Sequence, residues 1–421
     1  MTARPPDGSP VEPGRVERAV RLGDQLAHAW GSWGPNMTRD AGRVAFISDR
    51  RGRPELWVQE VVVSGGQPAP APLRLSDDPV VAVRWSADGG WLACAVATDG
   101  GVRTEVWVVR PDGTGARRVA GGGGTHADLG PWTRSGHRVA VTFPATPDAP
   151  ARSVLVDPAT GVREPLAVGG LIRVLDMSVG ERLVLLEDGP RGREFCVVVD
   201  RDSDTHHPLL PYPTTGATVT ALLRPAPPGQ RHLVAYLATD AGLPRRALVA
   251  MPLGPDGWRG QGGVLAARED AELEGLDADD AGRLLLLVWN VAGRSELELL
   301  DARTDERMPV AGLPGQVASS PVLSRDGSTV VVAVEGPTRP RELWHLDTAS
   351  GEWTRLTGVP RLPGQPLLVP TLETFTGRDG LALTGWLYRA LPGDTSGDEA
   401  GDTAGDTGWD PARPAPAGPA V

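Results

Sequence analysis

Lysine is absent from this 421-residue sequence, so all 42 of its basic side chains are arginine. Without lysine the chain cannot form a phosphate-loop site that needs lysine, a Schiff base or a Ser–Lys dyad. The arginines are outnumbered by 53 acidic residues, which gives a net charge of −11. A diffuse acidic balance of this kind argues against nucleic acid or an anionic membrane as the main partner.

Cysteine and long apolar runs are also scarce. Cys94 and Cys196 are the two cysteines, and each lies in an apolar run, which is typical of small buried hydrophobic residues rather than of a disulfide framework. The N-terminal segment MTARPPDGSPVEPG has no apolar core of the kind that a signal peptide needs. No run approaches the roughly 18 apolar residues of a membrane span. We therefore expect a cytoplasmic protein.

The sequence does contain a recurring unit, in which a polar turn ending in glycine is followed at once by an apolar run. Seven glycines mark it: Gly42, Gly89, Gly136, Gly180, Gly229, Gly282 and Gly327. Their successive spacings are 47, 47, 44, 49, 53 and 45 residues. In these turns Asp can bond the backbone beyond it, and we expect glycine to take a positive φ at no cost.

Residues 80–121 show most clearly which strands one unit contains. VVAVRWS alternates, which predicts Val81, Val83 and Trp85 on one face, and WLACAVA is apolar throughout, as suits a strand buried on both faces. Two further runs, separated by glycine turns, complete four strands in roughly 45 residues. The pattern predicts an all-β fold, a seven-bladed β-propeller of four-stranded antiparallel blades. We expect the first and last blades each to hold four strands of their own.

The sequences of three units resemble a known type of blade. RDAGRVAFISDRRGRPELWVQEV, WSADGGWLACAVATDGGVRTEVWVVRPDG and SRDGSTVVVAVEGPTRPRELWHLD resemble the WD-like blades of TolB-like propellers and of prolyl oligopeptidase relatives. Trp57, Trp107 and Trp344 lie in the third strand of these units. We interpret them as packing between blades rather than as platforms for a ligand.

A hairpin resembling the start of a hydrolase domain follows the seventh unit. After the linker PRLPGQPLLVP, the segment TLETFTGRDGLALTGWLYRAL has two alternating runs about a tight turn at Arg378, Asp379 and Gly380. It resembles the hairpin that opens the α/β-hydrolase domain of the prolyl oligopeptidase family, through these residues: Phe375, Asp379, Gly380, Leu383, Gly385, Trp386, Leu387 and Tyr388. The final PAPAGPAV resembles the approach to the next hydrolase strand, and we expect a chain cut short before the oxyanion segment.

Four parts are expected along the chain. Residues 1–30 form an N-terminal segment with a short helix, in which Val16, Val20, Ala27 and Trp30 lie near one face. This helix either docks on a hydrolase domain or covers the side of the propeller. The propeller occupies 31–365, a linker and the first hydrolase hairpin occupy 366–392, and an acidic and proline-rich tail occupies 393–421.

No catalytic residue is expected in this chain. No serine lies in a G-x-S-x-G nucleophile elbow; Ser178 in DMSVG comes nearest, but Asp176 stands at the first glycine position. The resemblance implies that the catalytic Ser, Asp and His all follow the oxyanion segment. The chain alone should therefore be inactive.

No metal ligand or cofactor site is expected either. Asp200, Asp202 and Asp204 begin like a calcium loop, but Thr205 stands at the glycine position and Pro211 at the closing glutamate position, which favours a hairpin turn.

Three other polar segments are interpreted in the same way. His206 and His207 are adjacent and point apart in a strand, which makes them poor co-ligands. The glycine-rich run 121–127 matches a dinucleotide pattern through Gly122, Gly124 and Ala127 but opens no helix, so it predicts a connection between blades. The basic cluster Arg50, Arg51 and Arg53 predicts a solvated turn.

Three functions remain open. The first is the non-catalytic propeller of a serine peptidase resembling acylaminoacyl peptidases and dipeptidyl peptidase IV relatives, which binds short peptides in its channel and gates a hydrolase domain. The second is a stand-alone TolB-like platform for binding proteins or ligands. The third is a propeller enzyme with polar groups in its channel, which usually needs a metal.

Overall fold

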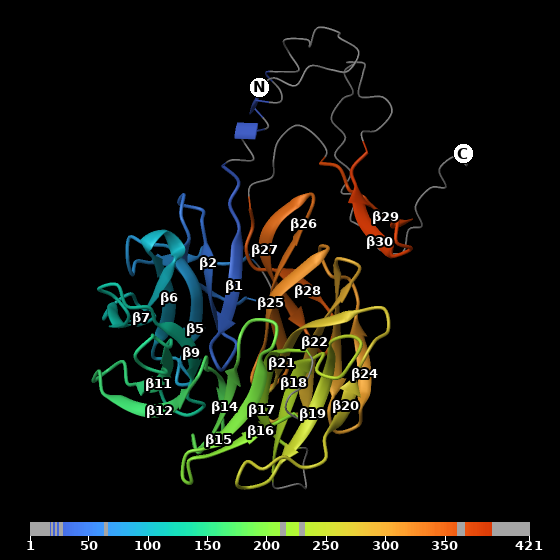
Figure 1. Ribbon diagram of the computed structural model, residues 1–421. Coiled ribbons are helices and arrows are strands. Elements are labelled where there is room, and N and C mark those ends of the chain that lie inside the picture. The colour runs from blue at the N-terminus through green and yellow to red at the C-terminus, as the bar shows by residue number, and fades with distance from the viewer. Residues whose placement is uncertain are drawn as a thin grey trace, which may run out of the picture.

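A computed structural model describes residues 17, 20, 21, 23, 24, 28–62, 66–210, 216–226, 232–359 and 367–389. Seven four-stranded antiparallel sheets surround a central axis as the blades of a propeller, and a two-stranded hairpin lies beside them (Figure 1). The predicted all-β, seven-bladed propeller is confirmed. No helix in the described ranges is long and apolar enough to cross a membrane.

Each blade is one continuous segment whose four strands pair in chain order. The strands of blades 1 to 4 are β1 (Ser32–Met37), β2 (Arg43–Ser48), β3 (Glu55–Glu60), β4 (Ala71–Leu73); β5 (Val80–Trp85), β6 (Leu92–Thr98), β7 (Arg103–Val109), β8 (Arg117–Ala120); β9 (Asp128–Trp132), β10 (Val139–Phe143), β11 (Ala151–Val156), β12 (Arg163–Gly169); β13 (Arg173–Met177), β14 (Leu183–Asp188), β15 (Phe195–Asp200), β16 (Thr205–Pro208). A short 3-10 turn, η1 (Asp99–Gly101), joins β6 to β7.

Blades 5 to 7 and the hairpin complete the chain. Their strands are β17 (Thr218–Pro225), β18 (Leu233–Thr239), β19 (Ala247–Leu253), β20 (Gly263–Ala266); β21 (Glu272–Ala278), β22 (Leu284–Val291), β23 (Arg294–Asp301), β24 (Glu306–Val310); β25 (Val317–Leu323), β26 (Thr329–Gly336), β27 (Arg339–Asp347), β28 (Trp353–Arg355); β29 (Thr371–Thr376) and β30 (Ala382–Leu387).

The first strand of every blade lines the axis and is irregular. Each of these seven strands shifts register against its neighbour within the blade. In β5 the shift falls between Val80 and Ala82, so Val80 is buried while Val81 is 47% exposed. The predicted common face of Val81, Val83 and Trp85 is therefore wrong for Val81, because a bulge inserts one residue into the alternation.

The turn glycines follow the prediction in part. Glycine has a positive φ in four of the turns after the first strand: Gly89, Gly136, Gly282 and Gly327. In blades 1 and 4 the positive φ falls instead on Ala41 (55°) and Glu181 (59°), beside Gly42 and Gly180. The expectation is wrong for these two glycines, since the neighbouring residue takes the left-handed position. Gly229 lies outside the described residues.

Apolar side chains fill the space between neighbouring blades. Seven buried clusters are present, and each draws its residues from two adjacent blades. Both cysteines belong to such clusters, as predicted: Cys94 between blades 1 and 2, and Cys196 between blades 4 and 5. Burial raises the pKa of both thiols. These interfaces, rather than the interior of any one blade, are the core of the protein.

Blade 7 closes the ring against blade 1 by packing. Phe46 and Trp57 of blade 1 share a buried cluster with Val331 and Leu343 of blade 7. Gln59 Nε2 also donates a hydrogen bond to the backbone carbonyl of Leu356 (2.9 Å). No strand is exchanged among the seven described sheets, which confirms that the first and last blades are complete.

The three blade tryptophans pack as predicted. Trp57 lies in the cluster between blades 7 and 1, Trp107 packs against the cluster between blades 1 and 2, and Trp344 packs against the cluster between blades 6 and 7. Their role is inter-blade packing.

The predicted N-terminal helix is described at five residues, 17, 20, 21, 23 and 24, which are helical. Val20 is 66% exposed. Val16 and Ala27 lie outside the described residues.

The predicted hairpin near the C-terminus is present. β29 pairs with β30 from Thr371 opposite Leu387 to Thr376 opposite Ala382. In the connecting turn Gly380 has a φ of 83°, in the left-handed region that favours glycine.

Phe46→Ala tests the closure of the ring. Phe46 is fully buried between blades 1 and 7, so its truncation should lower the free energy of unfolding by about 3–5 kcal/mol. Chemical denaturation of the full chain measures this change. Phe375→Ala is the matched control, because Phe375 is 55% exposed on the hairpin and its loss should leave the midpoint almost unchanged. Equal effects of the two substitutions would contradict closure by packing.

Candidate functional site

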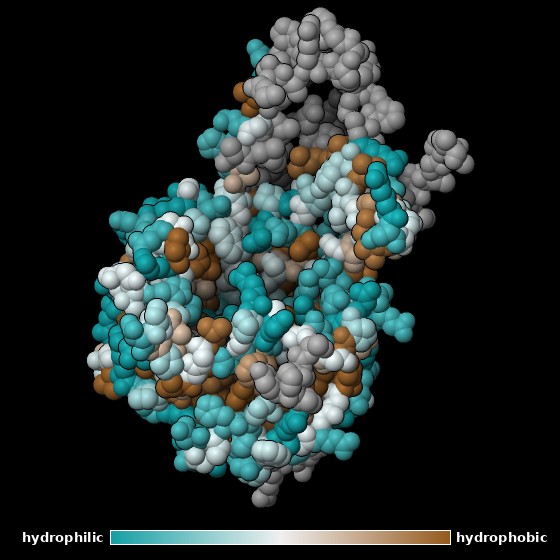
Figure 2. All heavy atoms as spheres, in the orientation of Figure 1, coloured by the Kyte–Doolittle hydropathy of each residue, from teal (hydrophilic) through white to brown (hydrophobic). Residues whose placement is uncertain are grey.

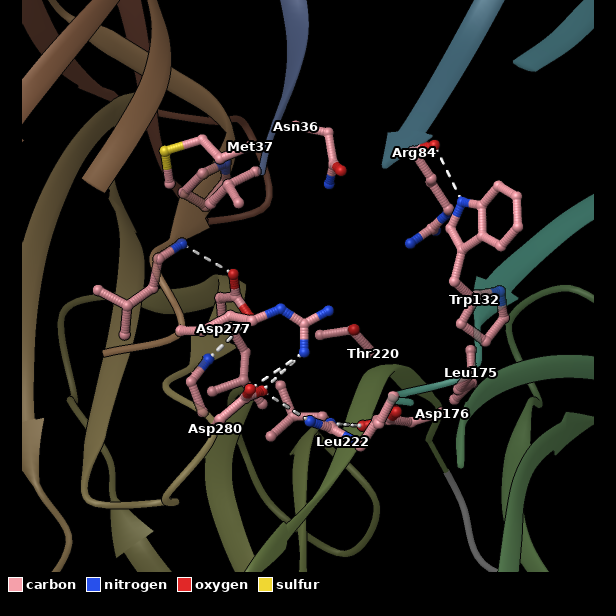
Figure 3. A pocket seen from close by; sticks show the side chains of 18 of the residues that line it. Asn36, Met37, Arg84, Trp132, Leu175, Asp176, Thr220, Leu222, Asp277 and Asp280 are labelled. Atoms are coloured by element: carbon pink, nitrogen blue, oxygen red, sulfur yellow. Dashed lines mark hydrogen bonds and ion pairs between the residues drawn. The ribbon is translucent and has the colours of Figure 1, made fainter. Parts of the chain in front are cut away.

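A cavity of about 540 Å³ lies on the propeller axis and is lined by residues from the first strands of all seven blades and the turns after them (Figure 3). Eight charged residues line it: Arg84, Arg134, Arg173, Arg224, Arg325, Asp176, Asp277 and Asp280. The lining is therefore rich in arginine, although the whole chain is acidic. A polar cavity on the axis of a propeller is the best candidate for a functional site in the described structure.

Arg134 bridges the channel from blade 3. Its Nη1 lies 3.2 Å from Asp280 Oδ1 in blade 6, and its Nη2 lies 2.7 Å from Asp176 Oδ2 in blade 4. Arg134 also donates to the backbone carbonyls of Met177 and Leu223. Blades 3 and 6 are as far apart around a seven-membered ring as two blades can be, so this side chain crosses the axis.

Asp280 of blade 6 contacts side chains from three other blades. Arg325 Nη1 of blade 7 lies 3.1 Å from both of its carboxylate oxygens, and Arg39 Nη2 of blade 1 lies 3.6 Å from Oδ2. Together with Arg134 these contacts tie Asp280 to blades 1, 3 and 7.

Asp176 holds a second arginine. Arg224 Nη1 of blade 5 lies 2.8 Å from Asp176 Oδ2, and Arg224 Nε donates to the backbone carbonyl of Asp279 (2.8 Å). Side chains from six blades are thus linked. We call this set the cross-channel network, and it consists of Arg39, Arg134, Asp176, Arg224, Asp280 and Arg325.

The cross-channel network lies at the face of the propeller remote from the hairpin. Arg39, Asp280 and Arg325 lie in the turns that follow the first strands of their blades. The hairpin contacts the other end of blade 6. The guanidinium of Arg294, at the start of β23, lies 4.7 Å from the ring of Trp386 in β30. Successive turns of an antiparallel sheet lie at opposite ends, so the network and the hairpin occupy opposite faces.

Polar side chains of the first strands also tether neighbouring blades. In three cases a side-chain oxygen accepts the backbone N–H of the next blade's first strand: Asn36 from Trp85 (2.7 Å), Asp176 from Leu223 (2.9 Å) and Asp277 from Leu323 (2.9 Å). The tether recurs at equivalent places in the ring, so the wall of the channel is held by the same groups that line it.

Asp277 has a perturbed pKa. Burial raises the pKa of its carboxyl to about 6, against hydrogen bonds from the backbone N–H groups of Leu323 and Ala278, which lower it. The nearest guanidinium atom in the described structure, Arg224 Nη2, is 3.7 Å away. The carboxyl therefore titrates within the physiological range.

The channel residues escaped prediction, although the sequence carries a signal for them. Arg84 and Asp176 are charged residues in otherwise largely apolar runs, each two positions before the first residue of the turn, and Asp277 stands at the equivalent place in a run that also contains Glu272 and Glu274. Arg134 lies further on, in the turn after β9. A charged residue inside a repeated apolar strand indicates a strand that faces a polar channel.

The residues considered for chemistry from the sequence lie elsewhere. Ser178 starts the turn after β13, where its backbone N–H bonds the carbonyl of Leu183. Asp200 ends β15, and Asp202 and Asp204 lie in the turn between β15 and β16, which confirms the hairpin. Asp200 accepts two hydrogen bonds from Arg182 (2.9 and 2.7 Å). Among the residues that the structure describes, no three His, Cys, Asp or Glu side chains are grouped to hold a metal ion.

The adjacent histidines make separate contacts. The ring of His207 packs edge-on against Trp258 with centroids 5.1 Å apart. His206 lies 3.9 Å from Asp204. The described structure brings neither histidine to the channel, whose lining excludes both.

The glycine-rich run connects two blades, as predicted. Gly122 and Thr125 pair with each other as an isolated β-bridge within the segment that joins β8 to β9. Ala127 is fully buried, and its carbonyl accepts the hydroxyl of Thr104.

The basic cluster differs from the prediction. Arg50 is not simply solvated: its guanidinium lies over the rings of Trp30 (4.4 Å) and Trp57 (4.6 Å), and burial lowers its pKa. Arg51 and Arg53 pair with Glu55 at 3.8 and 3.0 Å. The aromatic side chains, which the charge pattern did not include, account for the difference.

Comparison with known proteins supports the fold. No protein-family model matches the sequence, and no curated protein matches it. Among solved structures, prolyl oligopeptidase B from Galerina marginata superposes with a TM-score of 0.65 at 12% identity, over 88% of this chain and 58% of its own. A prolyl endopeptidase, studied for the role of inter-domain dynamics in catalysis and specificity, gives 0.65 at 17%, over 88% and 56%. Puromycin hydrolase gives 0.65 at 19%, over 85% and 58%.

The similarity is one of fold. The chain has the seven-bladed propeller of these structures, so the predicted resemblance to the propeller of the prolyl oligopeptidase family is confirmed at that level. It spans less than three fifths of the length of each of these proteins.

Asp277→Asn tests the environment of the channel. Burial raises the pKa of Asp277 from 3.8, the value in the unfolded chain, to about 6 in the folded one. The stability that its neutral form contributes is therefore fully present below pH 3.8 and is lost as the pH rises through 6. Relative to the non-titrating Asn variant, the native chain should lose roughly 1–3 kcal/mol of unfolding free energy between about pH 4 and pH 7. Urea unfolding of both proteins across this range measures the difference. A difference that is constant with pH would contradict the raised pKa.

Proposed function

We propose that this chain is the non-catalytic propeller part of a serine peptidase of the prolyl oligopeptidase type, which binds short peptides in its channel and gates their access to an α/β-hydrolase domain. The observation that carries the proposal is the channel itself: a polar cavity of about 540 Å³ within a closed ring, with the cross-channel network at one face. In this proposal the protein acts in the cytoplasm, without nucleic acid or membrane as a partner.

The size of the channel supports selection for short peptides. A cavity of this volume lies within the range of small-molecule and cofactor sites, so it holds a segment of a few residues and excludes a folded domain. The cross-channel network restricts it further, because the Arg134–Asp280 pair spans the axis. Passage through that face requires these ion pairs to separate.

The hairpin supports a partner domain on the opposite face. An isolated two-stranded hairpin is at best marginally stable in water. Large apolar side chains are nevertheless exposed on it, and Figure 2 shows hydrophobic atoms over this part of the surface. They include Leu372 (39%), Phe375 (55%), Leu383 (37%), Leu387 (40%) and Tyr388 (55%). A surface of this kind is typical of one that another domain covers.

The division of the chain follows from this role. Residues 31–365 form the propeller, and 366–392 form the linker and first hairpin of the hydrolase domain. Residues 1–30 and 393–421 flank them.

A stand-alone binding propeller is the second candidate. The closure of the ring by blades 1 and 7 favours it, since the propeller needs no further segment to complete its core. The apolar surface of the hairpin favours the peptidase part instead.

Reaction with a fluorophosphonate probe tests the absence of a nucleophile. The 421-residue chain should remain unlabelled, because no serine has the glycine neighbours of a nucleophile elbow. Fluorescence of the denatured protein on a gel measures the label, with a known serine hydrolase as the positive control. Stoichiometric labelling of the chain would overturn the non-catalytic role.

Asp280→Asn tests the gate. Removing this carboxylate charge weakens three contacts of the cross-channel network, those to Arg134, Arg325 and Arg39. An uncharged fluorescent peptide should then associate several-fold faster with the full chain, as measured by stopped-flow anisotropy. Asp77→Asn is the control, because Asp77 pairs with Arg74 on the exposed surface. If both variants associate at the native rate, the network does not gate the channel.

A further inference from the structure

Some polar side chains of the channel have hydrogen-bond partners within the protein, and others do not. The carboxylates are engaged: Asp176 and Asp277 each accept two backbone N–H bonds, and Asp280 accepts from two arginines. Four side chains of the lining keep donor groups for which the described structure shows no partner: Arg84, Asn36, Thr220 and, within the wall, Trp85. The described channel therefore has more hydrogen-bond donors to offer a ligand than acceptors.

Arg84 is the clearest of these donors. Trp132 Nε1 fixes its backbone by donating to the carbonyl of Arg84 (2.9 Å), and its guanidinium projects into the channel (Figure 3). Among the described residues no carboxylate lies within ion-pair distance of this guanidinium, whereas the neighbouring Arg173 pairs with Glu187 at 2.8 Å. Arg84 is exposed toward the open channel; desolvation and the charge of Arg173 lower its pKa, whereas the charges of Asp176 and Asp277 raise it. These carboxylates act on Arg84 from beyond ion-pair distance, so its N–H groups are free to meet a ligand.

Asn36 adds a second donor on the same part of the wall. Its Oδ1 accepts the backbone N–H of Trp85, the residue after Arg84, at 2.7 Å. This bond fixes the amide orientation, so Nδ2 and its two N–H groups are left for the channel (Figure 3). The described structure shows no partner for Nδ2.

The charge of the lining agrees with an anionic ligand. Five of its arginines face three aspartates, while the chain as a whole has a net charge of −11. A locally positive cavity in an acidic protein attracts anions and disfavours cations. A guanidinium matches a carboxylate in shape as well as in charge, because two parallel N–H groups meet its two oxygens.

We infer that Arg84 and Asn36 form a carboxylate-binding site in the channel, which selects peptides by an acidic side chain or by their C-terminal carboxylate. The inference rests on the proposed binding of peptides for its ligand. The guanidinium of Arg84 supplies the charge, and the amide of Asn36 supplies a directed neutral donor beside it. Neutral peptides have only carbonyl acceptors for these groups, which form weaker bonds than a carboxylate.

Three peptides of one backbone test the site on the full 421-residue chain. One has a free C-terminal carboxylate and no acidic side chain, one is amidated with a single Glu, and one is amidated with Gln in place of that Glu. Fluorescence anisotropy measures the dissociation constants. At least one of the two anionic peptides should bind roughly tenfold more tightly than the neutral one, as one charge-assisted hydrogen bond provides. The peptide that gains identifies the source of the carboxylate.

Variants of blade 2 link the preference to the site. Arg84→Gln should abolish the anionic preference, and Arg84→Lys should retain part of it. Arg117→Gln removes the same charge from the exposed outer strand β8 and should retain all of it. Equal binding of the three peptides, or a preference that survives Arg84→Gln, overturns the site while leaving peptide binding in place.

If no peptide binds, acetate tests the carboxylate site independently of the proposed peptide binding. Trp85 and Trp132 line the cavity, so intrinsic fluorescence should report acetate binding against chloride at equal ionic strength. Quenching or enhancement that Arg84→Gln removes supports the carboxylate site and refutes peptide binding as the function. A response that does not depend on Arg84, or no response, refutes the site.

Discussion

Burial of apolar side chains between neighbouring blades is the constraint on which the structure depends. The second strand of each blade is apolar on both faces because the blade is covered by one neighbour on each side, as β6 shows with five consecutive buried residues. No blade can bury both of its faces alone. Each interface is therefore complete only when the ring is complete, and the contact of blade 7 with blade 1 has the same physical origin as the other six.

The closed ring explains the chemistry of its channel. Once the apolar faces are buried between blades, the first strands face one another across the axis, and their polar side chains meet there. Asp176 illustrates the result: one carboxylate binds the backbone of the next blade, Arg134 from blade 3 and Arg224 from blade 5. Breaking such a nearly buried pair leaves an uncompensated charge, so these groups support the ring as well as forming the proposed gate. Arg84 differs because its charge has no such partner in the described structure, which is why it carries the inference of a ligand.

The sequence predicts the fold much better than the site. Regularly spaced glycine turns and apolar strands are local patterns, and they are sufficient to predict seven four-stranded blades. Local details fail where the backbone departs from regular alternation: the bulge in β5 exposes Val81, and Ala41 takes the left-handed position expected of Gly42.

The candidate site depends on long-range contacts that no local pattern contains. Arg134 and Asp280 are 146 residues apart and meet only because the ring brings blades 3 and 6 to one axis. The isolated charges in apolar first strands mark where polar groups face the channel, but not which of them pair and which remain open.

The central claim is that peptides bind along these strands. Hydrogen–deuterium exchange of the full chain with a saturating short acidic peptide tests it directly. The account predicts slower exchange in the first strands, including the amides of Leu223 and Leu323, and unchanged exchange in the outer strands β8, β16 and β24. Slower exchange confined to the outer strands or the hairpin would contradict it.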